Sequence, residues 1–373
     1  MSLFGNKDAY LGVDFGADGI KLVELHKTKG RPQLWTYGIA EEILDIHIPK
    51  ADKTPEELIY EQDSTKKKKK NEDLPKIDDP RVEKYAELLK ALLKEAKVTT
   101  KNATASLPVS CIFHTVVNLP YVEDKDIDHI IKAEIKKMLP QPIEEMQVVN
   151  QKIPQPGKEK PKYIKILVTA APKTLVAFYT AIFQKAGLEL KELETEAFAL
   201  ERSLVGNDKA IAMVVDIGAE RTNFFIIDQG LPLTHRSIDV AGETFDRILM
   251  STLGVDKDDV VQVKMDLSRI QQGVSIDVFR PVLDPIIKEI DYGFELFLSQ
   301  TGNEGKKPEK IILTGGSSVL PFLVDEIKVK FPMKVFVGDP WARVVHQEGL
   351  KMVLDKIGPR MAVSIGLALR NIV

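Results

Sequence analysis

The stretch IAMVVDIGAERTNFFIIDQG, residues 211–230, holds two apolar runs separated by a short polar turn. The runs have the length and the Val, Ile and Phe content of β-strands, and Gly218 opens the turn, so the sequence predicts a β-hairpin. Asp216 stands just before the turn. Backbone N–H groups around such a turn can point into one concavity and hold phosphate without a dedicated basic side chain. Because Asp and Gly are also ordinary turn residues, one such hairpin alone does not distinguish a binding turn from a structural one.

A second copy of this layout lies near the N-terminus. The stretch LGVDFGADGIKLVEL, residues 11–25, has an apolar strand that reaches Asp14, a Gly/Asp turn, and a second apolar strand that begins at Ile20. A third strand-like run over residues 33–40 extends this hairpin to a meander. Two hairpins with the same Asp-x-Gly turn, far apart in the chain, indicate duplicated halves that face one ligand.

Length, charge and cysteine content narrow the class of protein. A chain of 373 residues is long enough for two or more domains. Its net charge of −3 predicts no general attraction to nucleic acid or to an anionic membrane. The single cysteine, Cys111, excludes an internal disulfide, and the scattered histidines do not have the spacing of a zinc site. Without a signal peptide or an apolar run long enough to span a bilayer, the sequence predicts a soluble cytoplasmic protein.

Residues 49–80 differ in composition from the rest of the chain. They contain five consecutive lysines at positions 66–70, among acidic residues, asparagine and prolines. Such a segment cannot bury a core, so we expect a solvated insertion. A contact with acidic lipid headgroups or with an acidic partner is the alternative.

The remaining sequence alternates predicted strands and helices. Strands are expected over residues 102–108, 111–117, 163–171 and 310–314, and helices over residues 124–139, 174–186, 192–204, 281–301 and 361–370, with further helices beginning at residues 79 and 242. After the strand at 310–314, Gly315 and Gly316 allow backbone to touch a flat or charged ligand, because no Cβ stands in the way.

Small residues mark two of the predicted helices. Ala197 and Ala199 belong to one, and Ala362, Gly366 and Ala368 belong to the other. Small side chains let two helices approach closely. If these helices cross between the duplicated halves, they form a natural hinge axis.

These features occur in an order that resembles the actin-like ATPase superfamily, which includes actin, the heat-shock 70 chaperones, sugar kinases and FtsA. Within it, the chain resembles the PilM family of type IV pilus assembly proteins. The motifs that carry this resemblance are GVDFG at 12–16, IKLVE at 20–24, LPQP at 139–142, AGL at 186–188, EAFAL at 196–200, GDPWAR at 338–343 and GLALR at 366–370.

The resemblance implies an α/β fold of the actin-like ATPase type, with duplicated ribonuclease H-like halves around a nucleotide cleft. It also implies the extra subdomain that FtsA and PilM have. The implied divisions are 1–107 with 191–208 and 342–373 for the first domain, 108–190 for the extra subdomain, and 209–341 for the second domain, of which 240–308 form the outer subdomain.

The resemblance further implies ATP with Mg²⁺ in the cleft. Asp14 and Asp216 would hold the metal mainly through water, because Mg²⁺ keeps most of its hydration shell. Glu196 stands where a carboxylate would orient the attacking water. The other implied contacts form two phosphate turns and an adenosine border: Gly16, Ala17, Asp18, Gly19 and Lys21; Gly218, Ala219, Arg221 and Thr222; and Gly242, Glu243, Gly315, Gly316 and Ser317.

The charged residues of the two turns depart from the pattern of the superfamily. Asp18 brings a negative charge toward the phosphates, and it should weaken nucleotide affinity unless it turns outward or pairs with a cation. Glu220 adds a further negative charge, for which Arg221 would compensate. Lys21 is expected to contact either the phosphates or an acid of the neighbouring sheet. The turns therefore favour binding and switching over catalysis, with weak ATPase activity at most.

The resemblance implies one protein partner, the N-terminal cytoplasmic tail of a PilN-like inner-membrane protein. This tail would lie in a groove between the first domain and the extra subdomain and would recruit the chain to the membrane indirectly. ATP-dependent closure of the domains would set the affinity for partners. Val116, Leu119, Ile131 and Ile135 lie in the region of this groove, although the sequence favours a core position for each.

Two other functions stay open from the sequence. A sugar or acetate-type kinase would need a substrate pocket and a catalytic base near the second hairpin. A filament-forming protein similar to FtsA would self-associate. The extra subdomain resembles an interaction module, which favours the scaffold over the kinase.

Overall fold

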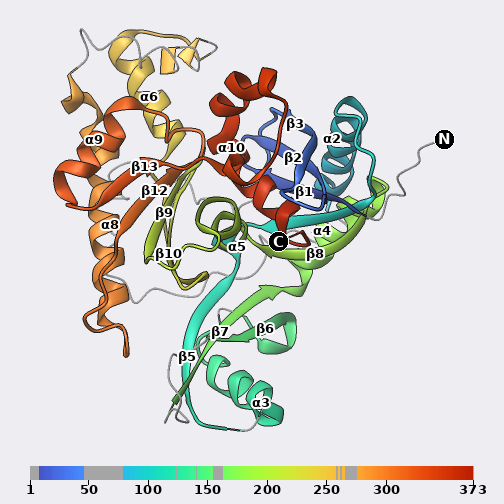
Figure 1. Ribbon diagram of the computed structural model, residues 1–373, viewed down its shortest axis with the longest axis vertical. Coiled ribbons are helices and arrows are strands. Elements are labelled where there is room, and N and C mark those ends of the chain that lie inside the picture. The colour runs from blue at the N-terminus through green and yellow to red at the C-terminus, as the bar shows by residue number, and fades with distance from the viewer. Residues whose placement is uncertain are drawn as a thin grey trace.

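The computed structural model describes residues 8–45, 79–122, 124–139, 141–153, 163–257, 259–260, 263–264 and 275–372. Within these residues the chain forms two five-stranded sheets and one three-stranded sheet (Figure 1). The two large sheets lie side by side in the upper part of Figure 1, and the small sheet projects below them. The lysine run at 66–70, with nearly all of the predicted insertion, lies outside the described residues.

The first sheet has the order β3-β2-β1-β4-β8. Its strands are β1 (Ala9–Gly16), β2 (Gly19–His26), β3 (Gln33–Ala40), β4 (Asn102–Leu107) and β8 (Glu189–Thr195). The first three strands are antiparallel, whereas β4 and β8 run parallel to β1. The predicted hairpin and its third strand are therefore confirmed. Apolar side chains from β1 and from helices α2 and α4 form the core on one face of this sheet.

The second sheet repeats this topology in the order β11-β10-β9-β12-β13. Its strands are β9 (Ala212–Ile217), β10 (Thr222–Asp228), β11 (Leu231–Ile238), β12 (Lys310–Thr314) and β13 (Lys334–Val337). Again three antiparallel strands are followed by two parallel ones. The hairpin that was predicted from residues 211–230 is β9–β10, and the duplication inferred from the two Asp-x-Gly turns is confirmed by the matching strand order.

The helices cover the sheets much as their apolar periodicity predicts. They are α2 (Arg81–Glu95), α3 (Asp124–Ile135), α4 (Lys173–Lys185), α5 (Glu196–Leu200), α6 (Gly242–Leu253), α8 (Arg280–Ser299), α9 (Pro321–Lys330) and α10 (Lys351–Leu369). In α8, the apolar side chains at i, i+3 and i+4 spacing are buried in the core of the second sheet. Helix α10 begins ten residues before the predicted one and continues through Pro359.

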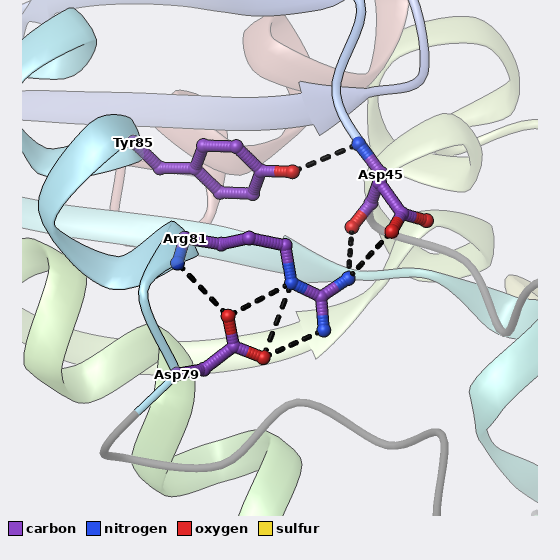
Figure 2. A network of polar contacts seen from close by, with 4 residues as sticks. All are labelled: Asp45, Asp79, Arg81 and Tyr85. Carbon is purple, nitrogen blue, oxygen red and sulfur yellow. Dashed lines mark hydrogen bonds and ion pairs between the residues drawn. The ribbon is translucent and has the colours of Figure 1, made fainter.

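Arg81 joins the two chain segments that border residues 46–78 (Figure 2). One guanidinium nitrogen donates to the backbone oxygen of Asp45 at 2.7 Å, and others donate to the Asp79 carboxylate at 2.7 to 3.1 Å. The hydroxyl of Tyr85 accepts from the backbone N–H of Asp45 at 2.8 Å. The hydrogen bonds from Arg81 lower the pKa of Asp79. Asp45 and Asp79 are therefore held close together by side chains of α2.

Helices α5 and α10 cross in close contact between the two large sheets, as their small residues predict. A Cβ on Gly366 would lie 1.9 Å from the backbone oxygen of Ala199. On its other side α10 packs against β1, where a Cβ on Gly12 would lie 2.1 Å from the backbone oxygen of Ser364. Only glycine allows backbones to approach this closely. The C-terminal helix therefore contacts both halves of the molecule.

The helix predicted over residues 192–204 is wrong in its first part. Strand β8 occupies this stretch up to Thr195, and the short helix α5 continues as a π-helix over Glu201–Val205. Glutamate and leucine favour a helix locally, but parallel pairing with β4 overrides that preference. Glu194 of the strand forms ion pairs with Arg202 and Arg370, so its buried charge is compensated.

The small sheet has the order β5-β7-β6, from β5 (Phe113–Pro120), β6 (Met146–Lys152) and β7 (Tyr163–Pro172). Helix α3 covers one face of this sheet with its apolar side. Leu119, Ile131 and Ile135 are buried in that core, and Val116 packs against the core of the second sheet. The preferred core interpretation is confirmed for Leu119, Ile131 and Ile135, whereas Val116 is only partly buried. The proposed domain boundaries stay a prediction.

Candidate functional site

Asp14 stands near the end of β1, the central strand of the first sheet. The neighbouring strand β4 places Ser106 beside it, and the Ser106 hydroxyl donates to Asp14 Oδ1 at 2.7 Å. Asp14 is 7% exposed. Burial raises the pKa of Asp14 above its ordinary value, although Lys21 and the Ser106 hydroxyl oppose this shift. Ser106 was not identified from the sequence, because only the pairing of β4 with β1 brings it to the site.

The first turn contains Gly16, Ala17, Asp18 and Gly19. Gly19 has a φ of 128°, and a Cβ on it would lie 1.9 Å from the backbone oxygen of Ala40, so the position requires glycine. Asp18 forms ion pairs with Lys21 and with Arg360 of α10. Burial acts to raise the pKa of Asp18, but Lys21 and Arg360 prevail and hold it below the ordinary value. Of the two outcomes considered for Asp18, pairing with cations is therefore observed.

Lys21 lies opposite Asp14 in the β1–β2 hairpin. Its side chain is 6% exposed and pairs with Asp18 of its own turn, and not with an acid of the neighbouring sheet. A Cβ on Gly16 would lie 2.8 Å from Lys21 Nζ and 3.3 Å from Asp18 Oδ1. The ion pair therefore lies directly over the backbone of the turn.

Asp216 is the counterpart of Asp14 in the second half. Strand β12 runs parallel to β9 and brings Thr314 and Gly315 beside it. Burial, followed by the charge of Asp14, raises the pKa of Asp216 to about 7, although Lys21 opposes the shift. Since Asp14 acts on Asp216 from the other half, the two hairpins bring their acids into one site, as the duplication predicted.

The second turn is held by the N-terminus of α6. The backbone N–H of Gly242 donates to Gly218 O at 3.0 Å, and that of Glu243 donates to Ala219 O at 2.9 Å. The Thr222 hydroxyl donates to the backbone oxygen of Val240 at 2.6 Å. Gly242 and Glu243, which were predicted to border adenosine, therefore contact the second turn.

Arg221 of this turn pairs with Asp239 at 3.2 Å. Its Nε atom is buried and has no hydrogen-bond partner among the described residues. Arg221 is therefore paired with Asp239, and its Nε retains one donor for a further acceptor.

Gly315, Gly316 and Ser317 complete the second half of the site. Gly315 has a φ of 85°, and its Cβ would lie 2.4 Å from Ile217 O and 2.5 Å from Asp216 Oδ1. The N–H of Ser317 donates to Ile217 O at 3.3 Å. A Cβ on Gly316 would lie 3.5 Å from the Cγ of Arg360. The sequence did not point to Arg360, since it is separated from both turns in the chain and belongs to no turn motif.

Glu196 begins α5 beneath these two acids. The backbone N–H of Val109 donates to Glu196 Oε2 at 3.5 Å. Burial, with Asp14 and Asp216 adding to it, raises the pKa of Glu196 well above its ordinary range. This shift disfavours the ionised carboxylate that would accept a proton from water.

A groove of ≈ 260 Å³ lies between the first sheet and the small sheet. Among the described strands, β8 is hydrogen-bonded only to β4, and β6 only to β7, so both are edge strands. The groove is lined by Leu107, Ile112, Gln147, Val149, Thr169, Ala171, Val176, Thr180, Leu190, Lys191, Glu192, Leu193, Glu194 and Thr195. It shares no lining residue with the acidic site.

The chain was compared with known proteins. The model of the family described as type IV pilus assembly protein PilM matches residues 72–372. A solved structure of a "PilM-PilN type IV pilus biogenesis complex" has 24% sequence identity and a TM-score of 0.76, with 98% of each chain covered. Ethanolamine utilization protein EutJ from Carboxydothermus hydrogenoformans has 16% identity and a TM-score of 0.53, over 97% of this chain and 89% of that chain.

These likenesses and the repeated strand order confirm the predicted actin-like fold. In the part of the chain that the structure describes, no helix has the length and apolarity needed to cross a bilayer.

Proposed function

This chain belongs to the family of the type IV pilus assembly protein PilM, and we propose that it is an ATP-binding scaffold that holds the cytoplasmic tail of a PilN-like inner-membrane protein. The observation that carries this proposal is the groove beside the edge strands β8 and β6, because β8 and its neighbour β4 line the groove and also lead into the acidic site. Family membership favours this role over the small-molecule kinase and the FtsA-like filament.

Nucleotide would bind between the two hairpins. The donor set fits Mg²⁺, because Asp14 and Asp216 come from opposite halves and the charge of Asp14 raises the pKa of Asp216. No group of three or more His, Cys, Asp or Glu side chains with metal-binding geometry occurs among the described residues. Water would therefore complete the shell, as Mg²⁺ prefers. The bound Mg²⁺ would neutralise phosphate charge.

The phosphates would lie against the two turns, with the first turn at Gly16 to Gly19 and the second at Gly218 to Thr222. Gly315 supports this placement, since its lack of a Cβ leaves Asp216 accessible at the turn. The raised pKa of Glu196 disfavours the carboxylate that hydrolysis would need, so it supports binding more directly than hydrolysis. The chain is therefore proposed as a nucleotide-binding switch with weak ATPase activity at most.

An extended peptide would fit the groove by adding main-chain hydrogen bonds to an edge strand. β8 offers such an edge, and Val149 on β6 presents an apolar side chain that is 60% exposed. In this mode of recognition the main chain supplies register and apolar pockets supply specificity. The exposed Val149 would contribute part of the apolar contact.

Two strands connect the groove with the acidic site. On β4, Leu107 lines the groove and its neighbour Ser106 donates to Asp14. On β8, Thr195 lines the groove, and the next residue is Glu196. A shift of either strand would move residues at both the groove and the acidic site. This arrangement supports closure around ATP that sets partner affinity, with the chain cytoplasmic and held at the inner membrane through its partner.

The groove is tested by calorimetry with a synthetic N-terminal tail of a PilN-like protein. Val149→Asp should weaken binding about tenfold or more, because a charge replaces an apolar contact in the groove. Val329→Asp is the matched control, since Val329 is 86% exposed on α9 and does not line the groove, and its affinity should match the wild type. Equal binding by both variants would reject the groove. Failure of the wild type to bind would reject the partner.

A further inference from the structure

Asp18 stands in the first phosphate turn, and two cations from different parts of the chain meet on its carboxylate. Lys21 of β2 contacts Oδ1, and Arg360 of α10 approaches Oδ2 at 3.4 Å. The Cβ position of Gly16 lies within 3.3 Å of both Lys21 Nζ and Asp18 Oδ1. The ion pair therefore occupies the space immediately above the turn, where the phosphates of a nucleotide would lie.

Lys21 has little access to solvent, so acidic side chains of the protein, and not water, stabilise its positive charge. Its side chain is 6% exposed, and Asp18 is the acid with which it forms an ion pair. Asp14 and Asp216 also interact with Lys21, because Lys21 lowers the pKa of each. Neutralising Asp18 would therefore leave Lys21 near two other acids and not isolated.

Arg360 brings a second cation to Asp18 from the C-terminal helix. Its side chain passes the Gly316 backbone and reaches the first turn, while a second nitrogen pairs with the exposed Glu41 at 2.9 Å. Arg360 thus lies between the Gly-Gly turn of the second half and the phosphate turn of the first. A carboxylate and a phosphate oxygen attract the same Lys and Arg donors.

We propose that Asp18 is an internal competitor of the nucleotide phosphate, which holds Lys21 and Arg360 until a bound phosphate displaces its carboxylate. The proposal rests on the proposed nucleotide site. Lys21 and Arg360 are then the cations that bind phosphate in this chain, and Asp18 sets the nucleotide concentration at which the cleft fills. Displacement frees the Asp18 side chain to turn toward solvent, because it is already 42% exposed.

The test measures binding of Mg-ATP, Mg-ADP and pyrophosphate by calorimetry for the wild type and for Asp18→Asn. Asparagine keeps the size of the side chain and is accepted in turns, but it carries no charge. Release of a charge-assisted pair should tighten binding of all three ligands about tenfold. Glu41→Gln is the matched control, because it removes the other acid that pairs with Arg360 and Glu41 lies outside the turn. The affinities of this variant for the three ligands should stay within about twofold of the wild type.

A double-mutant cycle identifies the cation. Arg360→Gln alone should weaken pyrophosphate binding, and in its presence Asp18→Asn should give a smaller gain than in the wild type. A second readout uses the free protein: Asp18→Asn should lower the midpoint of thermal unfolding without ligand, yet show a larger rise in that midpoint with pyrophosphate than the wild type.

The outcomes separate the two proposals. If the wild type binds nucleotide and Asp18→Asn binds it equally or more weakly, Asp18 does not compete with phosphate. The proposed nucleotide site would still stand. Absence of binding in both proteins, with Asp18→Asn folded by circular dichroism, would overturn both. Binding by Asp18→Asn alone would support both proposals.

Discussion

The two Asp-x-Gly turns have the same place in matching sheets but are stabilised by different interactions. In each, an acid ends the first strand of a hairpin, and a parallel strand lies beside it. The first turn is dominated by charge, because Asp18 holds Lys21 and Arg360, although the backbone N–H of Leu44 also donates to Ala17 O at 2.9 Å. The second turn is fixed by backbone contacts, since Gly242 and Glu243 donate to it and Gly315 packs against Asp216.

This difference teaches that a duplicated fold does not require duplicated chemistry. The second turn is prearranged by its glycines and by the start of α6. The first turn depends on which anion its cations hold. We therefore expect substitutions in the second turn to act on structure and metal binding, and substitutions in the first turn to act on the affinity for phosphate.

The largest effect should come from the acid of the second turn. Asp216→Ala should weaken Mg-ATP binding by about 100-fold or more, the loss expected when one partner of a buried charge is removed. Asp14→Ala should weaken binding to a similar degree, if the two halves contribute equally to the metal. Calorimetry with and without Mg²⁺ measures both. Unchanged affinity of Asp216→Ala would reject the cleft as the nucleotide site.

The second prediction compares a glycine that packs beside the second turn with a glycine of the first turn, by urea unfolding. Gly315→Ala should lower the free energy of unfolding by about 3 kcal/mol, because it combines a strained φ with a backbone clash. Gly187→Ala is the control for backbone strain alone, since Gly187 has a φ of 81° with open space around it. This substitution should lower the free energy of unfolding by about 1 kcal/mol.

Gly16→Ala in the first turn should lower the free energy of unfolding by less than about 1 kcal/mol. At close range the new Cβ would meet only the movable ends of the Lys21 and Asp18 side chains. If Gly16→Ala were as destabilising as Gly315→Ala, the first turn would be as rigid as the second, and the contrast between the turns would be lost.

The third prediction concerns pH. Asp216 must lose its proton to hold Mg²⁺, and with a pKa of about 7 its ionised fraction rises about tenfold from pH 6 to pH 8. Mg-ATP affinity should rise by the same factor, as measured by titration at each pH. A flat profile over this range would contradict the assignment of Asp216 to the metal.

The stability of the free protein should change in the opposite direction. The pKa of Asp216 is raised on folding from its ordinary value of 3.8, so its contribution to stability is complete below that value and is lost as the pH rises through about 7. Asp216→Asn should remove this part of the pH dependence in chemical unfolding experiments.

The smallest effect should come from the ion pair of the second turn. Asp239→Asn releases only Arg221 from a partly exposed pair, and such pairs contribute little. Nucleotide affinity should change by less than about threefold, against the tenfold gain expected for Asp18→Asn. A larger gain for Asp239→Asn in calorimetry would place the competing anion in the second turn.

Much of the fold followed from local patterns. Alternation and apolar runs predicted β1, β2, β9 and β10, and helical spacing predicted α2 and α8. The stretch at 192–195 could not be predicted in this way, because its Glu and Leu content favours a helix until β4 is available for pairing. Long-range pairing decided that strand, together with its exposed edge.

The candidate site was predictable where a turn marks it and not elsewhere. Asp14, Asp216 and the glycines of both turns were found because acids and glycines at strand ends are visible in the sequence. Ser106 and Arg360 were missed, since a serine within a strand and an arginine within a helix carry no signal of their own. Only the sheet order and the path of α10 bring them to the turns.

The sequence by itself determined that two similar hairpins exist, that each presents an acid, and that small residues allow two helices to meet. These are properties of neighbouring residues and of repeated patterns. Tertiary structure alone decided that Asp14 raises the pKa of Asp216, that Asp18 is paired with Arg360, and that β8 and β6 leave a groove between them. The physical reason is that charge interactions and strand edges depend on distances in space, and residues far apart in the chain acquire those distances only when the halves pack together.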